Sequence, residues 1–276
     1  KMQDNNSQTL FFLGSGNMAS AIGRGLVAQN SSLNLGFYDQ AWAKALAMTV
    51  ELPGTKSTRA LPDAVAFADV LLLAVKPQDM PALVDELAPL LRPGQLVLTI
   101  AAGLPLAWYQ ARLPQGTPLV RAMPNTSAAV GEAITGLMAG KFATDAHKTL
   151  AEQVFAAVGS FIWLAEEEIH ALTAISGSGP AYYYYFTEAL AAAGEALGLS
   201  PQTAAALARQ TAIGAGRLLQ VQADSSPTQL REQVTSKGGT TAAALSVFAE
   251  NEALPQLVQQ ACRACAERSR EMADEN

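Results

Sequence analysis

The fold class follows from one stretch near the start of the chain, Thr9-Leu10-Phe11-Phe12-Leu13-Gly14-Ser15-Gly16-Asn17-Met18-Ala19. Its first five residues predict a buried strand, and residues 17–29 have the spacing of a helix. In the turn between them, Gly14 permits a sharp bend and Gly16 lets a ligand approach the backbone, while Ala19 needs only to be small. A strand, a glycine-rich turn and a helix in this order are typical of the first unit of a parallel α/β sheet.

The same alternation continues along the first part of the chain. Residues 70–75 form an apolar run without polar alternation, which suits a central strand covered on both faces. We therefore predict a doubly wound α/β domain over residues 9–165 and an all-helical domain over residues 166–276. The further strands are expected at 33–38, 96–100, 119–122 and 161–164, with one more after 134, and the further helices at 41–48, 79–90, 144–158, 166–198, 201–222, 227–234 and 240–273.

Composition excludes several classes of protein. A chain of 276 residues with 50% apolar and 15% charged residues is globular rather than disordered, and its length favours two domains. The net charge of −6 and the lack of any Lys or Arg run argue against binding to nucleic acid or anionic membranes. Residues 1–8 are polar, without the apolar region of a signal peptide, and are left out of the fold prediction. We expect a cytoplasmic protein.

The two cysteines, Cys262 and Cys265, lie three residues apart in a predicted helix. No second Cys or His pair completes a four-ligand site, so we expect packing residues and no metal. His147 and His170 have no partner by spacing, and we expect a solvated and a packing role for them. Residues 182–186 place aromatic side chains around a helix turn, which predicts burial on most sides and a subunit contact.

The turn at Gly14 predicts a dinucleotide site, because amides of a first helical turn bind a pyrophosphate. Asp39 ends the second strand, where a carboxylate commonly accepts the ribose hydroxyls and favours NAD. Two observations oppose that preference: Asp39 is also placed to start the next helix, and Lys44 is close enough in sequence to reach a phosphate.

Two later strand ends extend this site. Residues 74–77 leave the central strand at its carboxyl end, where Lys76 is either a surface charge or part of the cofactor cleft. Asn125 offers an amide for a nicotinamide or substrate, or else forms an Asn-Thr turn. The predicted cofactor-binding residues are Gly14, Ser15, Gly16, Asn17, Met18, Asp39, Ala74, Val75, Lys76, Pro77 and Asn125.

The helical half carries two glycine-bearing interruptions, residues 176–180 and residues 235–241. Glycine costs roughly 1 kcal/mol relative to Ala inside a helix, so the first interruption suggests close approach of a ligand or a neighbouring helix. The second one precedes a helix, and its free amides and hydroxyls could bind a carboxylate. A simple helix cap would need only one hydroxyl, so we favour a ligand site over a cap. The predicted substrate-binding residues here are Ser236, Gly238, Gly239 and Thr240.

In order and spacing, the chain resembles pyrroline-5-carboxylate reductases. The motifs that carry the resemblance are Gly14-Ser15-Gly16-Asn17-Met18-Ala19, Ala74-Val75-Lys76-Pro77-Gln78, Val120-Arg121-Ala122-Met123-Pro124-Asn125-Thr126, Ser176-Gly177-Ser178-Gly179-Pro180-Ala181-Tyr182 and Thr235-Ser236-Lys237-Gly238-Gly239-Thr240-Thr241. The resemblance implies reduction of 1-pyrroline-5-carboxylate to L-proline with NADPH or NADH.

The resemblance also implies structure and residue roles. It implies a Rossmann-type domain and an all-helical dimerisation domain, with helices interleaved in a homodimer or a higher oligomer. Thr241 matches the position whose hydroxyl lies close to the imine nitrogen, and Asp224 is a further substrate-site candidate. Many members carry Asn-Arg-Ser/Thr after the second strand, whereas this chain has Asp39-Gln40-Ala41. Strong selectivity for NADP is therefore not expected.

Two other functions compete with this one. A related two-domain dehydrogenase acting on other imines or hydroxy acids typically needs a Lys or Asp acid on the first helix between the domains, and residues 176–182 contain neither. A non-catalytic dinucleotide sensor would keep residues 14–19 but has no use for the receptor at 238–241.

Overall fold

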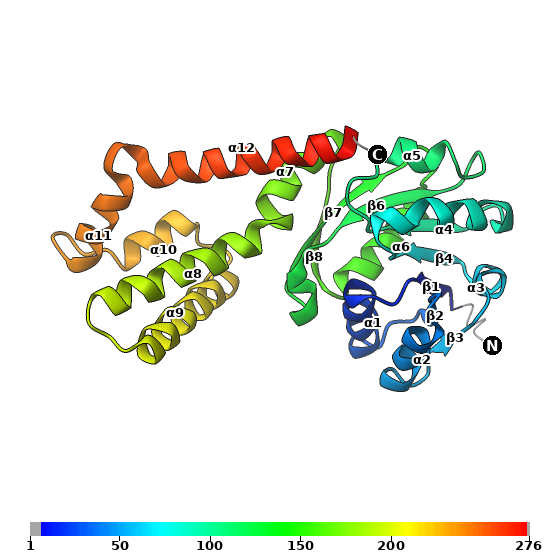
Figure 1. Cartoon of the computed structure of the whole chain (residues 1–276), viewed down its shortest axis with the longest axis horizontal. Helices are drawn as coiled ribbons and strands as arrows, with labels where there is room; N and C mark the ends of the chain where they lie inside the picture. The colour runs from blue at the N-terminus through cyan, green and yellow to red at the C-terminus, as the bar shows by residue number, and fades with distance from the viewer. Residues whose placement is uncertain (1–6, 275–276) are drawn as a thin grey trace. The chain divides into compact units, whose positions relative to one another are not determined.

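In the computed structural model, which describes residues 7–274, the strands form one eight-stranded sheet in the order β3-β2-β1-β4-β5-β6-β7-β8 (Figure 1). All neighbouring strands are parallel except β6 and β7, which are antiparallel. The strands are β1 (Thr9–Leu13), β2 (Asn34–Tyr38), β3 (Lys56–Ser57), β4 (Val70–Leu73), β5 (Leu96–Thr99), β6 (Leu119–Met123), β7 (Ala133–Ala139) and β8 (Gly159–Trp163).

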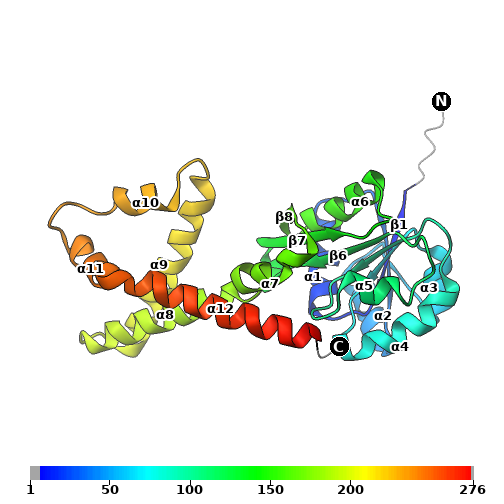
Figure 2. The same ribbon diagram turned by 90° about the horizontal axis from the view of Figure 1, so that it is seen from above.

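Helices cover both faces of this sheet (Figures 1 and 2). Successive residues of β1 point to opposite faces, so that Phe12 stacks on Phe37 on one face, with ring centroids 4.8 Å apart, while Phe11 packs on the other. The helices of the Phe12 face are α1 (Asn17–Ala28), α2 (Trp42–Glu51) and α6 (Asp145–Ala156); those of the Phe11 face are α3 (Leu61–Phe67), α4 (Met80–Leu87) and α5 (Leu106–Gln110).

The strand order confirms the predicted doubly wound sheet and locates its switch point. Because β1 lies between β2 and β4, the chain runs outward in opposite directions from the β1–β4 pair. Open α/β sheets bind ligands beyond the carboxyl ends of the strands at this position. The turn at Gly14 leaves β1 there, and the fully buried β4 ends beside it.

Several sequence-based boundaries were wrong in detail. The antiparallel β7 departs from the predicted parallel sheet, since an apolar strand pattern carries no direction. The elements β3, α3 and α5 were missed because two to seven residues are too few to show a period. The predicted helix 79–90 is α4 flanked by 3₁₀ turns at Pro77–Asp79 and Ala88–Leu90, each with a proline in its first turn.

The rest of the described chain is helical, as predicted. The helices are α7 (Ile169–Leu172), a π-helical turn (Thr173–Gly177), α8 (Gly179–Ala196), α9 (Pro201–Val221), α10 (Pro227–Gln233), α11 (Thr240–Ala249) and α12 (Ala253–Asp274). The prediction of one helix over 240–273 was wrong, because Asn251 and Glu252 adopt left-handed φ angles of 52° and 57° and separate α11 from α12.

The chain divides into two compact units. The first runs to Gly177 and also includes the chain from Ala266 onward, and the second is Ser178–Cys265. This division lies further along the chain than the boundary expected at 165/166. Residues 166–177 group with the sheet because Glu166 and Ser176 are hydrogen-bonded to it and to its loops.

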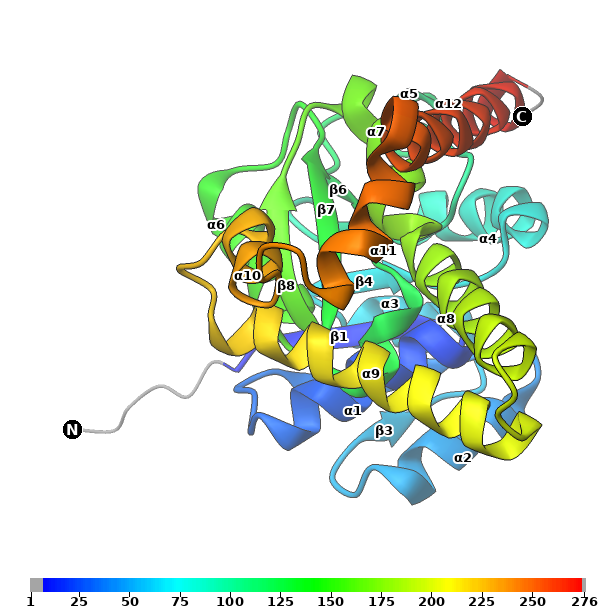
Figure 3. The same ribbon diagram turned by 90° about the vertical axis from the view of Figure 1, so that its left-hand side faces the viewer.

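The second unit has almost no core of its own. Helices α8 and α9 pack against each other and converge at the short loop that joins them (Figure 3). Among the described residues of this unit, the buried apolar side chains are Ala204 and Ala208. Tyr183, Tyr184 and Tyr185 are 65–73% exposed, so a single chain does not bury these three side chains, and the expected subunit contact stays a prediction. Exposed apolar side chains that are grouped together are typical of protein interfaces. Among the described helices, none combines the length and apolarity needed to span a membrane.

Candidate active site

Gly14 is fixed by steric fit at the switch point of the sheet. Its φ is +104°, and a Cβ there would lie 2.7 Å from the carbonyl oxygen of Ala74 and 3.0 Å from the nitrogen of Val75. Its own N–H donates to the carbonyl of Tyr38 at 2.8 Å. The turn is therefore held between β2 and β4, and only glycine fits it.

The next residues leave the start of α1 open. Gly16 is the N-cap residue with no side-chain cap, and a Cβ on it would meet nothing within 4 Å. The helical hydrogen bonds begin with the N–H of Ser20 donating to Gly16, so the amides of the first turn have no intrahelical acceptor. The hydroxyl of Ser15 is also buried without a partner in the described structure. Open amides, an unpaired hydroxyl and free space above Gly16 fit a bound pyrophosphate.

Asp39 fastens this turn to the end of β2. Its Oδ2 accepts the N–H of Ser15 and its Oδ1 accepts the N–H of Ala41, both at 2.9 Å. The second contact forms a turn before α2, but the N-cap residue of that helix is Ala41 and has no side-chain cap, so the alternative that Asp39 caps the helix was wrong. Each oxygen keeps another lone pair for a hydroxyl, so the structural role does not remove the capacity to bind a ribose.

Residues 74–77 lie at the same edge of the sheet. The N–H of Ala74 donates to Leu13 at 2.8 Å, which continues the β1–β4 pairing past the strand ends. Lys76 is exposed and precedes the 3₁₀ turn that begins at Pro77. The structure thus brings Gly14, Asp39 and residues 74–77 together at the carboxyl ends of β1, β2 and β4.

Asn125 contacts its own chain with both ends of its amide. Its Oδ1 accepts the N–H of Ser127 at 3.1 Å, which is the Asn-Thr turn of the alternative interpretation. Its Nδ2 donates to the carbonyl of Ser176 at 3.0 Å, and the side chain is buried. Asn125 thereby ties the end of β6 to the π-helical turn, and π-turns recur at functional sites.

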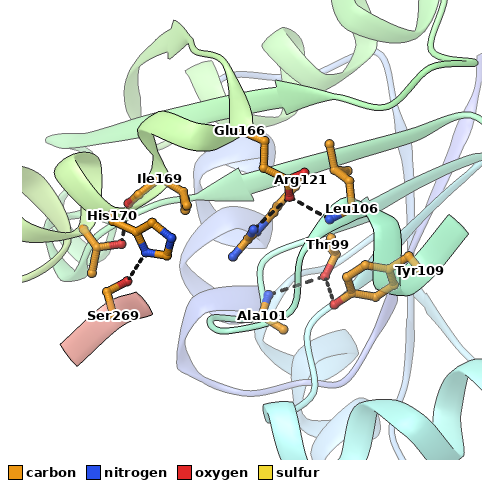
Figure 4. A network of polar contacts seen from close by, with 10 residues as sticks. Thr99, Ala101, Leu106, Tyr109, Arg121, Glu166, Ile169, His170 and Ser269 are labelled. Atoms are coloured by element: carbon orange, nitrogen blue, oxygen red, sulfur yellow. Dashed lines mark hydrogen bonds and ion pairs between the residues drawn. The ribbon is translucent and has the colours of Figure 1, made fainter. Parts of the chain in front are cut away.

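A buried ion pair near this strand was missed by the sequence analysis. Glu166 Oε1 accepts from Arg121 Nη1 at 2.9 Å and from the N–H of Leu106 at 2.6 Å (Figure 4). Arg121 has only 6% of its side chain exposed. The available signal was a single charge inside the apolar strand at 119–122, and a buried charge needs a partner. The pair fixes the chain that leads to α7 against β6 and α5.

Two titratable groups lie close to this pair. The Tyr109 hydroxyl is 2.7 Å from Thr99 Oγ1, and burial raises the pKa of Tyr109 to about 12. His170 Nδ1 is 2.9 Å from the hydroxyl of Ser269 near the end of α12, and burial lowers the pKa of His170 (Figure 4). The packing role expected for His170 is therefore accompanied by a hydrogen bond that spacing did not reveal. His147 likewise has a partner, Thr144, in a capping box at the start of α6.

The second unit contains the other predicted cluster, at the start of α11. Gly238 has a φ of +72°, and Gly239 is an N-cap residue without a side-chain cap. The N–H of Gly239 donates to the carbonyl of Ser236 at 3.0 Å, and a Cβ on Gly239 would collide with the Ser236 hydroxyl. Helical bonding begins with Ala243 donating to Gly239, which leaves the preceding amides open.

The hydroxyl-bearing residues of this cluster differ in exposure. Ser236 and Thr240 are exposed, and Thr241 is half-buried on the first turn of α11. Asp224 lies in the turn between α9 and α10 and is exposed. Within the described residues, no hydrogen bond or ion pair joins Asp224 to residues 236–241. The structure therefore places the predicted residues together at the start of α11, without a hydrogen bond or ion pair to Asp224 among the described residues. These residues are Ser236, Gly238, Gly239, Thr240 and Thr241.

Known proteins resemble both halves of the chain. Residues 166–272 match the family model described as pyrroline-5-carboxylate reductase dimerisation, and residues 9–103 match the model described as NADP oxidoreductase coenzyme F420-dependent. A pyrroline-5-carboxylate reductase of Pseudomonas aeruginosa is 42% identical over 265 residues, which are 96% of this chain and 96% of that protein.

Solved structures agree with these matches. A pyrroline-5-carboxylate reductase from Coxiella burnetii has a TM-score of 0.92 at 36% identity, covering 97% of this chain and 99% of that one. The Plasmodium falciparum pyrroline carboxylate reductase, solved with NADP bound, has a TM-score of 0.79 at 27% identity, covering 99% and 100%. With this identity extending over nearly its full length, the chain belongs to the pyrroline-5-carboxylate reductase family.

Proposed function

We propose that this protein reduces 1-pyrroline-5-carboxylate to L-proline with a hydride from NAD(P)H, as the last step of proline biosynthesis. The observation that carries the proposal is the open start of α1 at the switch point, in a chain of this family. The residues there fit a dinucleotide, whose reduced nicotinamide supplies the hydride.

The proposed dinucleotide site uses the groups at the carboxyl edge of the sheet. The amides of Asn17 and Met18 and the hydroxyl of Ser15 would bind the pyrophosphate, and Gly14 and Gly16 make room for it. Asp39 would accept hydroxyls of the adenosine ribose. The remaining proposed contacts are with Ala74, Val75, Lys76 and Pro77, and with the end of β6 near Asn125, which acts by holding the π-helical turn in place.

The proposed carboxylate receptor is the start of α11. Its open amides and the hydroxyls of Ser236 and Thr240 offer donors to the substrate carboxylate, and Gly238 and Gly239 let the backbone approach it. A positive helix end also favours an anion. This arrangement selects a small carboxylated substrate.

The proposed chemistry requires little acid or base strength. A protonated cyclic imine is already electrophilic at C5, so the protein must orient that carbon and exclude water. The Thr241 hydroxyl is assigned to hydrogen bonding at the imine nitrogen, where it holds or relays the proton. Asp224 is the further candidate for stabilising the iminium charge, and its exposed position makes it the less supported of the two.

The proposed assembly is a homodimer or a higher oligomer built through the second unit. The exposed aromatic residues of α8 and the sparse core of residues 178–265 support a second copy as the cover. The proposed location is the cytoplasm, where the free thiols of Cys262 and Cys265 stay reduced.

One assay tests the reaction. The purified protein is given 1-pyrroline-5-carboxylate with NADPH and, in parallel, with NADH, and both cofactor oxidation and L-proline are measured. We expect that one molecule of L-proline is formed for each molecule of cofactor oxidised. No turnover with either cofactor, or turnover with a hydroxy acid or a different imine instead, would overturn the proposal.

A further inference from the structure

Arg59 lies beside the proposed adenosine end of the dinucleotide site. Strands β2 and β3 pair in parallel with Gly36 opposite Lys56 and Phe37 opposite Ser57, and Thr58 still donates to the carbonyl of Phe37 at 3.1 Å. If the register is continued by two residues, Arg59 after β3 comes opposite Asp39 after β2. Parallel strands end at the same edge of a sheet, so the two charges occupy neighbouring positions there.

The guanidinium of Arg59 is held in place without being neutralised. Its Cζ lies 5.0 Å from the ring centroid of Trp42, the first residue of α2. A cation over an indole face is attracted to it, which restricts the side chain while leaving its N–H groups free. Arg59 is exposed, and none of the ion pairs among the described residues includes it.

Asp39 by itself would disfavour a phosphate at this position. Its carboxylate is anchored by the N–H groups of Ser15 and Ala41, so the negative charge stays at the end of β2. A carboxylate there accepts ribose hydroxyls and repels a 2′-phosphate, whereas an arginine nearby accommodates that phosphate. The planar guanidinium binds phosphate through two parallel hydrogen bonds.

We propose that Arg59, seated on Trp42, binds the 2′-phosphate of NADPH, while Asp39 serves the ribose hydroxyls of NADH. The pair makes the protein able to use both cofactors although it lacks a basic residue directly after β2. Removing Arg59 converts the site to one for NADH. This inference rests on the proposed dinucleotide site but not on the identity of the imine.

Binding of the oxidised dinucleotides without substrate tests the assignment. Isothermal titration of the full chain with NADP⁺ and with NAD⁺ gives two dissociation constants for the wild type and for Arg59→Gln. We expect Arg59→Gln to weaken NADP⁺ binding about tenfold or more, since charge-assisted bidentate bonds are lost, and NAD⁺ binding less than about twofold. Arg59→Lys keeps the charge but not the bidentate geometry, and should fall between the two.

The chain contains a matched control. Arg112 follows α5, and its Cζ lies 4.1 Å from the ring centroid of Trp108 within that helix, outside the proposed site. Arg112→Gln should leave both dissociation constants unchanged. Lys44→Gln tests the competing assignment of the phosphate to Lys44, in the first turn of α2. Melting temperatures confirm that the variants fold.

Three results overturn the inference: an equal loss of NADP⁺ and NAD⁺ binding in Arg59→Gln, no loss in that variant, or a selective NADP⁺ loss in Lys44→Gln instead. If the wild type binds neither dinucleotide, the inference fails together with the cofactor site. If the dissociation constants split as expected while 1-pyrroline-5-carboxylate is not reduced, the inference stands and the proposed reaction fails.

Discussion

The N-termini of α1 and α11 have nearly the same backbone conformation, but different contacts hold the turns that precede them. Gly16 before α1 has φ −80° and ψ −175°, and Gly239 before α11 has φ −81° and ψ 174°; neither helix has a side-chain cap. The turn at Gly14 is held by β2, by β4 and by the carboxylate of Asp39. The turn at Gly238 has contacts within residues 235–243 and carries exposed hydroxyls.

The difference follows from where each unit obtains its stability. The sheet unit buries large side chains on both faces, so the turn at Gly14 is a consequence of a core completed within one chain. The second unit exposes large apolar side chains on α8, α9, α11 and α12, which a second copy would cover in the proposed assembly. In the proposed assembly, the first candidate site is set by folding alone, and the second by folding and assembly together.

The largest expected effect is at Gly14. A Cβ there meets Ala74 at a φ of +104°, so Gly14→Ala should lower the free energy of unfolding by on the order of 3 kcal/mol. Gly16→Ala meets nothing and has an ordinary φ, so it should keep the wild-type melting temperature but weaken NADP⁺ binding. Calorimetry and titration measure both. Wild-type binding by Gly16→Ala would remove the turn from the pyrophosphate site.

A charge on the exposed aromatic face tests the dependence on assembly. Tyr184 on α8 is 65% exposed in the single chain. Tyr184→Asp should weaken subunit association by about 2 kcal/mol, which raises the dissociation constant of the oligomer about thirtyfold. Analytical ultracentrifugation measures this constant. Phe67→Asp is the control, because Phe67 is 68% exposed on α3 of the other unit. Equal dissociation of both variants would contradict the assignment of the interface to the second unit.

A smaller effect is expected at the start of α11. Thr241→Ala should lower kcat about tenfold, equivalent to about 1.4 kcal/mol, with little change in NADPH binding, because a hydrogen bond to the reacting imine is lost. Ser246→Ala removes an exposed hydroxyl from the same helix, one that donates to Ala243 at 2.7 Å, and should keep full activity. Steady-state kinetics with 1-pyrroline-5-carboxylate compare the two. An unchanged kcat in Thr241→Ala would exclude that residue from the mechanism.

The smallest effect concerns pH. Burial lowers the pKa of His170 in the folded chain below its ordinary value of 6.5. As the pH falls, His170 is therefore protonated in the unfolded chain at a higher pH than in the folded chain, and this favours unfolding. The wild type should therefore lose stability between about pH 7.5 and about pH 5.5, and His170→Gln should lose less over the same range. Urea unfolding at the two pH values measures this. Identical pH slopes would show that His170 does not contribute.

The sequence by itself determined the α/β order, the central strand and both glycine-bearing helix starts. These features depend on local rules: an apolar run without alternation is buried on both faces, and glycine is placed where a side chain would clash or hinder an approaching ligand. The turn at Gly14 was predictable for this reason. The φ of +104° and the contact with Ala74 give the physical cause.

The tertiary structure alone decided the features that depend on residues far apart in the chain. The antiparallel direction of β7, the Arg121–Glu166 pair and the contact of Asn125 with Ser176 each join residues that no periodicity relates. The break at Asn251 was hidden because its helical composition continues on both sides. Arg59 became significant only when strand register placed it beside Asp39, since sequence distance carries no information about which strand ends meet.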